Sequence, residues 1–416
     1  MSNWLGSAVT RAESVSDWLS PQRQQSLALL RQAKWPNRKA EAWKYTPLFA
    51  LEKAEFSTNA QAKANVAVID GLGSIDIVFV DGKLQSPLSD LPKGLSVCSL
   101  SEANQDDRTR ALALFCKAKP KKHFFGLVND VLAENGVLID IAEGVSIDRP
   151  LRIVSVLTAG KEAHTRVLVR VGRASKATVI EQYSGNEKSF NTGFAEYDVG
   201  PQGSLEHYRF ALQTQQAMAI GGSHFNLAEK ACLNSTVVGF GSELSRVDMD
   251  VSHLGEHAFA KLNVIFLLDG KELFDLHSTI EHAVANGTTE ENVNSIVASQ
   301  SRAVFNGRIH IHRDAQKTLA ELNNRNLLMS RDAEINTKPE LEIYADDVRC
   351  AHGATIAEID KKALYYLQSR GVSRGHAQVM LSFGFINELI DLMPNAALAE
   401  WIRPIIRERF AQMEVK

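Results

Sequence analysis

Apolar and polar residues alternate along the middle of the chain with a period of two. The segments Val167–Val171 (VLVRV) and Arg308–His312 (RIHIH) both show this alternation. A period of two places the apolar side chains on one face of an extended strand, whereas a helix repeats them every three to four residues. The pattern therefore predicts β-structure for the middle of the chain.

The same region also repeats at a nearly constant interval. Similar segments begin at Val171, Val199, Leu227 and Leu254, which are 28, 28 and 27 residues apart. Each segment starts with an apolar and a small residue, passes a polar corner and continues with alternating apolar positions. Weaker copies begin at Ile141 and Ile311. A period of this length indicates stacked structural units.

A repeat of this length is too short to hold two strands and a connecting helix. We therefore expect a parallel β-helix, in which each repeat forms one coil and the coils stack about 4.8 Å apart. The inward apolar residues of successive coils would form continuous ladders. A β-sandwich with accidentally even strand spacing is the alternative.

Helical patterns flank the repeats. Ser20 and Pro21 predict a helix start, with Ser20 as the N-cap. Near the C-terminus, Asp360 and Ser373 predict two further helix starts, and a third helix is expected from about Ala396 to Phe410, with a kink or break at Pro404. We divide the chain into an N-terminal helical region (1–65), a small α+β connecting region (66–135), a β-helix core (136–358) and a C-terminal helical domain (359–416).

Composition narrows the class of protein. The chain has 46 Lys+Arg and 49 Asp+Glu, a formal net charge of −3, which excludes the broadly basic surface of non-specific nucleic-acid binding. Its four cysteines lie far apart without a CxxC motif, so neither a disulfide framework nor a structural zinc site is indicated. No secretory signal pattern or apolar run of roughly 18 residues is visible. We therefore expect a cytoplasmic protein that does not cross a membrane.

The sequence contains no recognisable nucleotide-binding loop. A Walker A motif needs Ser or Thr after Gly-Lys, and none of the three Gly-Lys pairs is followed by either residue. We expect no nucleotide to bind this chain, so that any ATP-driven step would be carried out by another chain.

Histidine pairs raise the question of a metal site. His310 and His312 share a strand face, but no acidic or thiol ligand lies beside them in sequence, so we favour polar residues on the solvated side of a coil. His253 and His257 lie in strand and corner sequence, where a spacing of four does not bring two rings together. His277 and His282 are interpreted as structural.

Other residues suggest different chemistry. Asp248 and Asp250 alternate on one strand and resemble the carboxylate pair of a sugar hydrolase, although a solvated surface is favoured. Cys98, Cys116 and Cys232 have apolar or small neighbours and are interpreted as buried small hydrophobic residues.

The most specific candidate site is Cys350 with His352. On an extended strand the two side chains project from the same face about 7 Å apart. Thiolate and imidazole are suitable ligands for iron or an iron–sulfur cluster, and Arg349 could favour the thiolate. Because two ligands fall short of the usual four, the pair would be half a site, completed across an interface. A packed cysteine beside a hydrogen-bonded histidine is the alternative.

Two groups of residues carry a resemblance to a known family. Arg349–Thr355 (RCAHGAT), followed by Tyr365–Gly371 (YYLQSRG), closely resembles the SufD subunits of the SUF iron–sulfur cluster assembly system. Trp43–Leu48 (WKYTPL) resembles the N-terminal signature of the same family. The resemblance implies a right-handed parallel β-helix flanked by N-terminal and C-terminal helical segments.

The SufB branch of this family has a different pattern. SufB-like members carry His-Glu-Ala-Thr where this chain has His352–Thr355 (HGAT). They also have a cysteine shortly before a Leu-Leu pair, where this chain reads Asn323–Leu328 (NNRNLL). The chain therefore resembles SufD more than SufB.

The resemblance implies a non-catalytic scaffold that pairs with SufB, while the ATPase SufC docks on the C-terminal helices. The nascent cluster or iron would bind transiently at the SufB–SufD interface, with the histidine at the position of His352 and the thiol of Cys350 as ligands from this chain. Our candidate SufC contacts are Tyr365, Leu367, Arg370 and Phe383. The sequence leaves open a homodimer of the isolated chain and a flavin in the complex.

A polysaccharide lyase or hydrolase is the competing class, because parallel β-helices often bind sugars along a groove. It would predict secretion, a carboxylate-lined or calcium-binding cleft and exposed aromatic residues on the coils. Aromatic residues make up only 7% of the chain, and several of them lie in the end segments. A purely structural spacer is the third class.

Overall fold

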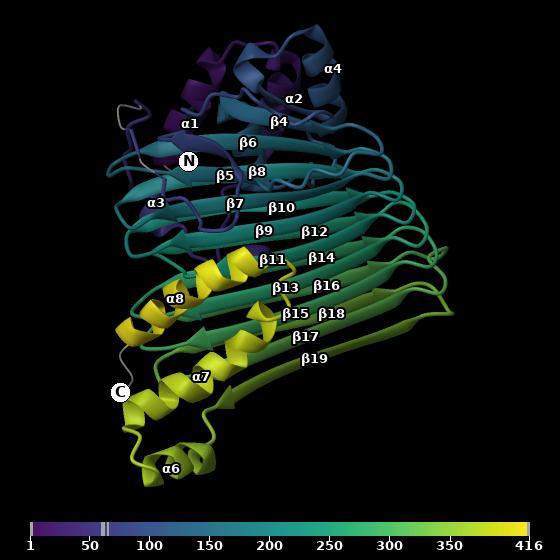
Figure 1. Cartoon of the computed structure of the whole chain (residues 1–416). Coiled ribbons are helices and arrows are strands. Elements are labelled where there is room, and N and C mark those ends of the chain that lie inside the picture. Colours follow the sequence, from purple (N-terminus) through teal and green to yellow (C-terminus); the bar gives the residue numbers. More distant parts are fainter. Residues whose placement is uncertain (1–2, 60–62, 65, 414–416) are drawn as a thin grey trace.

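The computed structural model describes residues 3–59, 63–64 and 66–413. It shows stacked parallel strands in two sheets that form one long solenoid, with helices at both ends (Figure 1). The predicted parallel β-helix is confirmed, and the β-sandwich alternative is wrong. The expected boundary between the first two regions, at residue 65, lies outside the described residues.

From β4 onward the strands alternate between the two sheets along the chain. One sheet has nine strands, in chain order β3 (Leu95–Ser99), β4 (Asn135–Ile141), β6 (Glu162–Val171), β8 (Ser189–Val199), β10 (Ala217–Leu227), β12 (Leu244–His253), β14 (Leu273–His282), β16 (Arg302–Ile311) and β18 (Glu334–Ile343). The other has ten, in chain order β1 (Ile75–Val80), β2 (Lys83–Leu84), β5 (Leu151–Val156), β7 (Lys176–Gly185), β9 (Ser204–Gln213), β11 (Cys232–Gly239), β13 (Phe259–Leu268), β15 (Thr288–Val297), β17 (Leu319–Leu328) and β19 (Arg349–Glu358).

The sequence repeat is the strand register itself. Lys176 lies opposite Ser204, which lies opposite Cys232, so that equivalent residues are 28 apart in the chain. Later coils are longer, and Thr288 lies opposite Leu319, 31 residues further on. The longer interval explains why the repeat becomes harder to recognise towards the C-terminus.

The polar corners of the repeats share one backbone conformation. Ala174, Gln202, Lys230 and His257 occupy equivalent corner positions and have φ between 53° and 61°. Positive φ is the left-handed region, which side chains other than glycine adopt rarely and at a cost of about 1 kcal/mol per residue. Backbone hydrogen bonds to the neighbouring coil hold the corner in place, for example from the Gln202 amide to the Glu229 carbonyl.

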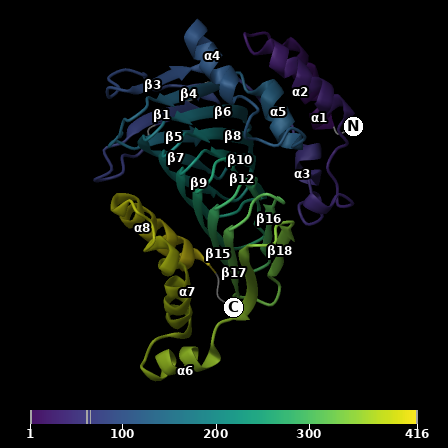
Figure 2. The same cartoon turned by 90° about the vertical axis from the view of Figure 1, so that its right-hand side faces the viewer.

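Helices cover the outer faces of the two sheets on opposite sides (Figure 2). The N-terminal helices lie over the nine-stranded sheet, where Phe190, Phe194 and Ile220 face outward into a buried apolar cluster. They comprise α1 (Asn3–Ser14), α2 (Ser20–Gln32), η1 (Glu41–Trp43), α3 (Phe49–Glu52) and α5 (Phe124–Leu132), whereas η2 (Leu100–Glu102) and α4 (Gln105–Leu114) lie near the first coil.

The C-terminal helices α7 (Arg374–Ile390) and α8 (Ala396–Gln412) cover the ten-stranded sheet, after the short helix α6 (Lys361–Ser369). Ile386 and Ile402 pack against outward residues such as Phe210. Strands that are covered on both faces are apolar on both, as in Val264–Leu268, so their alternation is weaker than for a half-exposed strand.

Several predicted helix ends agree with the structure and two differ. The Asp360 side chain accepts a hydrogen bond from the Lys362 amide and the Ser373 side chain accepts one from the His376 amide, which confirms both N-caps. Ser20, by contrast, is the first helical residue, and Leu19 occupies the N-cap position. Helix α8 runs through Pro404 without a break. Among the described residues, no helix is long and apolar enough to span a bilayer.

The two ends of the solenoid differ. At the first end, residues of α4 pack with outward residues of β4 and β6 in a buried apolar cluster. At the other end, β18 and β19 are the outermost strands of their sheets, and none of their described residues is buried. Figure 1 shows β19 as the last, uncovered strand of the stack. An uncovered edge is able to pair with another chain.

Candidate functional site at the open end

Cys350 and His352 lie on β19, at this open end. Cys350 is opposite Ala320 and His352 is opposite Leu322, and both of these β17 residues are fully buried. The two side chains therefore continue inward-facing columns of the solenoid, on the same face of the strand as predicted. Because no described coil follows, Cys350 is only half-buried and His352 is exposed.

The pair is incomplete as a metal site. Among the described residues, no third histidine, cysteine or carboxylate joins Cys350 and His352 within metal-ligand distance. Burial raises the pKa of the Cys350 thiol, and a backbone hydrogen bond with Ala320 opposes this only in part. Arg349 is not among the groups that shift this pKa, so its stabilisation of the thiolate stays a prediction, and a bound metal would have to deprotonate the thiol.

Large apolar side chains surround the open end. Ile343 ends β18, Tyr344 follows it, and Ile356 lies on β19; these residues are 42%, 60% and 50% exposed. A group of exposed apolar residues beside an unpaired strand edge is typical of a protein–protein interface.

Helix α6 extends this exposed surface beyond the last coil. None of its described residues is buried, and Tyr365 is 73% exposed. Arg370, just after the helix, is exposed, and Leu367 is half-buried. Phe383 instead lies on α7, where its ring is 6.3 Å from that of Phe410 in α8. Phe383 therefore contributes to helix packing.

The N-terminal WKYTPL segment packs on the outer face of the nine-stranded sheet. The Arg246 guanidinium lies 4.1 Å from the centre of the Trp43 ring. The Thr46 hydroxyl donates a hydrogen bond of 2.5 Å to Asp275, and Arg246 donates one of 3.1 Å to the same carboxylate oxygen. The segment is thus attached through a buried cluster of charged and polar groups.

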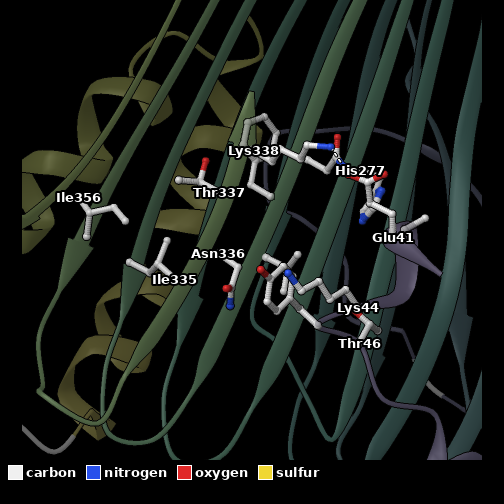
Figure 3. A pocket seen from close by; sticks show the side chains of 14 residues that line it. Glu41, Lys44, Thr46, His277, Ile335, Asn336, Thr337, Lys338 and Ile356 are labelled. Carbon is white, nitrogen blue, oxygen red and sulfur yellow. Dashed lines mark hydrogen bonds and ion pairs between the residues drawn. The ribbon is translucent and has the colours of Figure 1, made fainter. Parts of the chain in front are cut away.

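A pocket of about 400 Å³ separates this segment from the open end. Figure 3 shows Glu41, Lys44 and Thr46 on one side of it and residues of β18 and β19 on the other, including Ile335, Thr337 and Ile356. Lys338 of β18 also lines the pocket and forms ion pairs with Glu41 of the N-terminal segment and with Glu340 of its own strand. The N-terminal segment therefore reaches the last coils of the solenoid.

Two sequence interpretations need correction. Asp248 is not on a solvated surface, because it is buried beneath the N-terminal helices and bonded to Arg246 and His123. Its neighbour Asp250 bonds His224 and is only partly accessible. The two carboxylates therefore do not form an open sugar-binding pair.

His310 and His312 do have an acidic neighbour, which sequence reasoning missed. Glu281 of β14 accepts hydrogen bonds from both rings. It precedes His310 by 29 residues, close to the coil interval, so a search at that spacing would have found it.

His253 stacks on His282 of the next coil, with ring centres 4.1 Å apart, and does not pair with His257. Cys98, Cys116 and Cys232 are half-buried, not fully buried.

Comparisons with known proteins agree with these features. The sequence model of the SufBD core domain of the SUF system for FeS cluster assembly matches residues 155–385, and that of the SufBD N-terminal region matches residues 7–153. The chain belongs to the SufBD family. It is 32% identical over 400 residues to the iron–sulfur cluster assembly protein SufD of Escherichia coli, covering 94% of this chain and 93% of that protein.

Two further relatives are similar to this chain over most of its length. The chain is 25% identical over 405 residues to an iron–sulfur cluster assembly SufBD family protein of Synechocystis, covering 92% and 89% of the two chains. It is 27% identical over 420 residues to the chloroplastic protein ABCI7 of Arabidopsis thaliana, covering 94% and 88%. Membership of the SufBD family makes the chain a subunit of an iron–sulfur cluster assembly system.

Proposed function

We propose that this chain is the SufD-type scaffold of a cytoplasmic SUF complex and carries out no catalysis itself. Its open end would stack on the paralogue SufB, and the nascent cluster would bind at their seam with Cys350 and His352 as ligands from this side. The observation that supports this most directly is that both side chains continue buried columns yet remain uncovered.

The cluster is cargo in this proposal and leaves for an acceptor protein. On this proposal both chains are needed for cluster assembly, because the remaining ligands would come from SufB. The sugar-hydrolase class loses its best candidate, since Asp248 is buried beneath the N-terminal helices.

The test is cluster formation in a complex reconstituted with SufB and SufC. We compare His352→Ala, Cys350→Ala and the control His376→Ala, which removes an exposed histidine of α7. We expect His352→Ala to reduce bound iron and acid-labile sulfide at least about tenfold, because loss of even an outer-shell partner of a metal ligand costs about that much affinity, with a smaller defect for Cys350→Ala. The complex should still assemble. Full loading in both variants would refute the half-site.

The ATPase SufC would dock on α6 and the adjacent exposed face of α7. A chain ending near Ile359 is unsuitable for testing this, because removal of α7 and α8 exposes the apolar outer face of the ten-stranded sheet.

Tyr365→Glu and Arg370→Glu change exposed residues and leave the docked helices in place. We expect both to weaken SufC capture at unchanged thermal stability, whereas Phe383→Ala should lower stability. Unchanged capture by the double variant Tyr365→Glu/Arg370→Glu would contradict this docking site.

A further inference from the structure

Glu281, His310 and His312 form a compact group of ligand atoms on the outside of the solenoid. The Nδ1 atom of His310 is 2.5 Å from Oε2 of Glu281, and the Nε2 atom of His312 is 2.9 Å from the same oxygen. One nitrogen or oxygen from each residue lies within 4.8 Å of the others. These separations are short enough for all three groups to bind one ion.

The coil geometry creates this group. His310 lies directly opposite Glu281 in the parallel ladder between β14 and β16. Ile309 and Ile311 point inward and are fully buried, so His310 points outward. His312 follows at the corner, and its ring centre lies 4.3 Å from that of His310. The edge of the Tyr344 ring packs against His310 at 5.4 Å and limits the movement of that ring.

The charges around the group favour a cation. Arg308 donates to Oε1 of Glu281 and to both oxygens of Glu342. It therefore leaves Oε2 of Glu281 facing the two imidazoles. Two carboxylates and one guanidinium give a net charge of −1 when the imidazoles are neutral, and this negative charge attracts a cation.

The site is also accessible. The side chains of Glu281, His310 and His312 are 30%, 17% and 46% exposed, so an ion could enter from solvent and keep water in its remaining positions. Two imidazoles and one carboxylate suit zinc or iron(II), whereas magnesium and calcium prefer oxygen ligands alone.

We propose that Glu281, His310 and His312 bind a first-row divalent transition-metal ion at a site separate from the Cys350–His352 surface. Each imidazole would present the nitrogen that now faces Glu281 and carry its proton on the other ring nitrogen. The inference does not depend on the proposed function, because it rests on ligand geometry alone.

The test uses full-length, untagged protein carrying Cys350→Ala and His352→Ala, so that the open-end ligands cannot contribute. Titration with Co²⁺ should give visible d–d absorption that saturates at one equivalent, and Zn²⁺ should displace it. Adding His310→Ala and His312→Ala should weaken Co²⁺ binding by at least about 100-fold, because two of three ligands are lost. Mg²⁺ should not compete.

Controls separate a specific site from scattered surface histidines. His376→Ala removes an exposed imidazole on α7 and should leave the titration unchanged. Excess Zn²⁺ should also raise the unfolding temperature of the parent and not of the His310→Ala/His312→Ala variant, because only binding to the folded state stabilises it. Absence of Co²⁺ binding in the parent, or equal binding in both proteins, would overturn the proposal. The single variant His312→Ala, at an exposed corner, replaces the double variant if that one fails to fold.

Discussion

At the residue scale, the interior of the solenoid is less apolar than its repeat pattern suggests. One inward column, read through the strand registers, contains His207, Ser235, Leu262, Glu291 and Leu322 before it reaches His352. The Glu291 side chain is buried, and in the described part of the chain its carboxylate oxygens make no well-formed hydrogen bond, so the nearby Ser278 hydroxyl offsets the effect of burial only in part. Burial raises the pKa of Glu291 from 4.5 to about 7.

This raised pKa predicts a pH-dependent effect of Glu291→Gln. Between pH 4.5 and 7 the folded state holds a proton that the unfolded state has released, so the glutamate lowers stability increasingly as pH rises, and constantly above pH 7. Removing the charge should therefore raise the free energy of unfolding at pH 8 by up to about 3 kcal/mol and change it little at pH 5. Thermal or urea unfolding at the two pH values measures this.

The matched control is Glu290→Gln, on the same strand. Glu290 points outward and pairs with Lys261 at 3.0 Å. Loss of such a partly exposed ion pair costs at most about 1 kcal/mol. If both variants respond to pH in the same way, Glu291 is not the destabilising buried acid.

At the element scale, the sequence predicts the helices better than it predicts where they pack. Capping residues such as Asp360 and Ser373 act within one turn and can be read locally. The outer sheet faces that the helices cover are harder to predict. From the sequence alone, an outward residue such as Phe190 or Phe210 cannot be distinguished from an apolar residue that points into the solenoid. Asp248 was misassigned for this reason, since only the tertiary structure shows that α5 and its N-cap His123 cover it.

The attachment of the N-terminal segment predicts a local effect of Thr46→Val. The substitution keeps the side-chain shape and removes the hydroxyl that bonds Asp275, a fully buried carboxylate. Arg246 still donates to this oxygen, so the loss is that of one hydrogen bond to a charged group, about 1.5–3 kcal/mol, and we expect lower stability and faster hydrogen exchange and proteolysis in residues 41–54. Thr10→Val is the control, because Thr10 is exposed and bonds a carbonyl of its own helix. Equal exchange in both variants would contradict this role of Thr46.

At the scale of the whole molecule, the repeat predicted the solenoid, and the motif around His352 predicted where chemistry would lie. The sequence does not predict which side chains meet between neighbouring coils, as Glu281 and His310 do. Such contacts depend on the register between two parallel strands, which a local sequence pattern does not define. Which end of the solenoid is open could not be predicted either, because only the strand order of the folded sheets shows that β18 and β19 are edge strands.

The open end predicts that one charge should prevent assembly without unfolding the chain. Ile356 lies opposite the buried Asn326 and remains 50% exposed because no described coil covers it. In the isolated chain, Ile356→Lys can extend its ammonium into solvent, so stability should change by less than about 1 kcal/mol. In a stacked complex the same ammonium would be buried without a partner, at a cost of several kcal/mol, so affinity for SufB should fall at least about 100-fold in sedimentation or calorimetric titrations. Leu254→Lys is the control, since Leu254 is 53% exposed at a corner between β12 and β13. Equal affinity in the two variants would show that the complex forms elsewhere, and self-association that Ile356→Lys also abolishes would show that a homodimer uses the same surface.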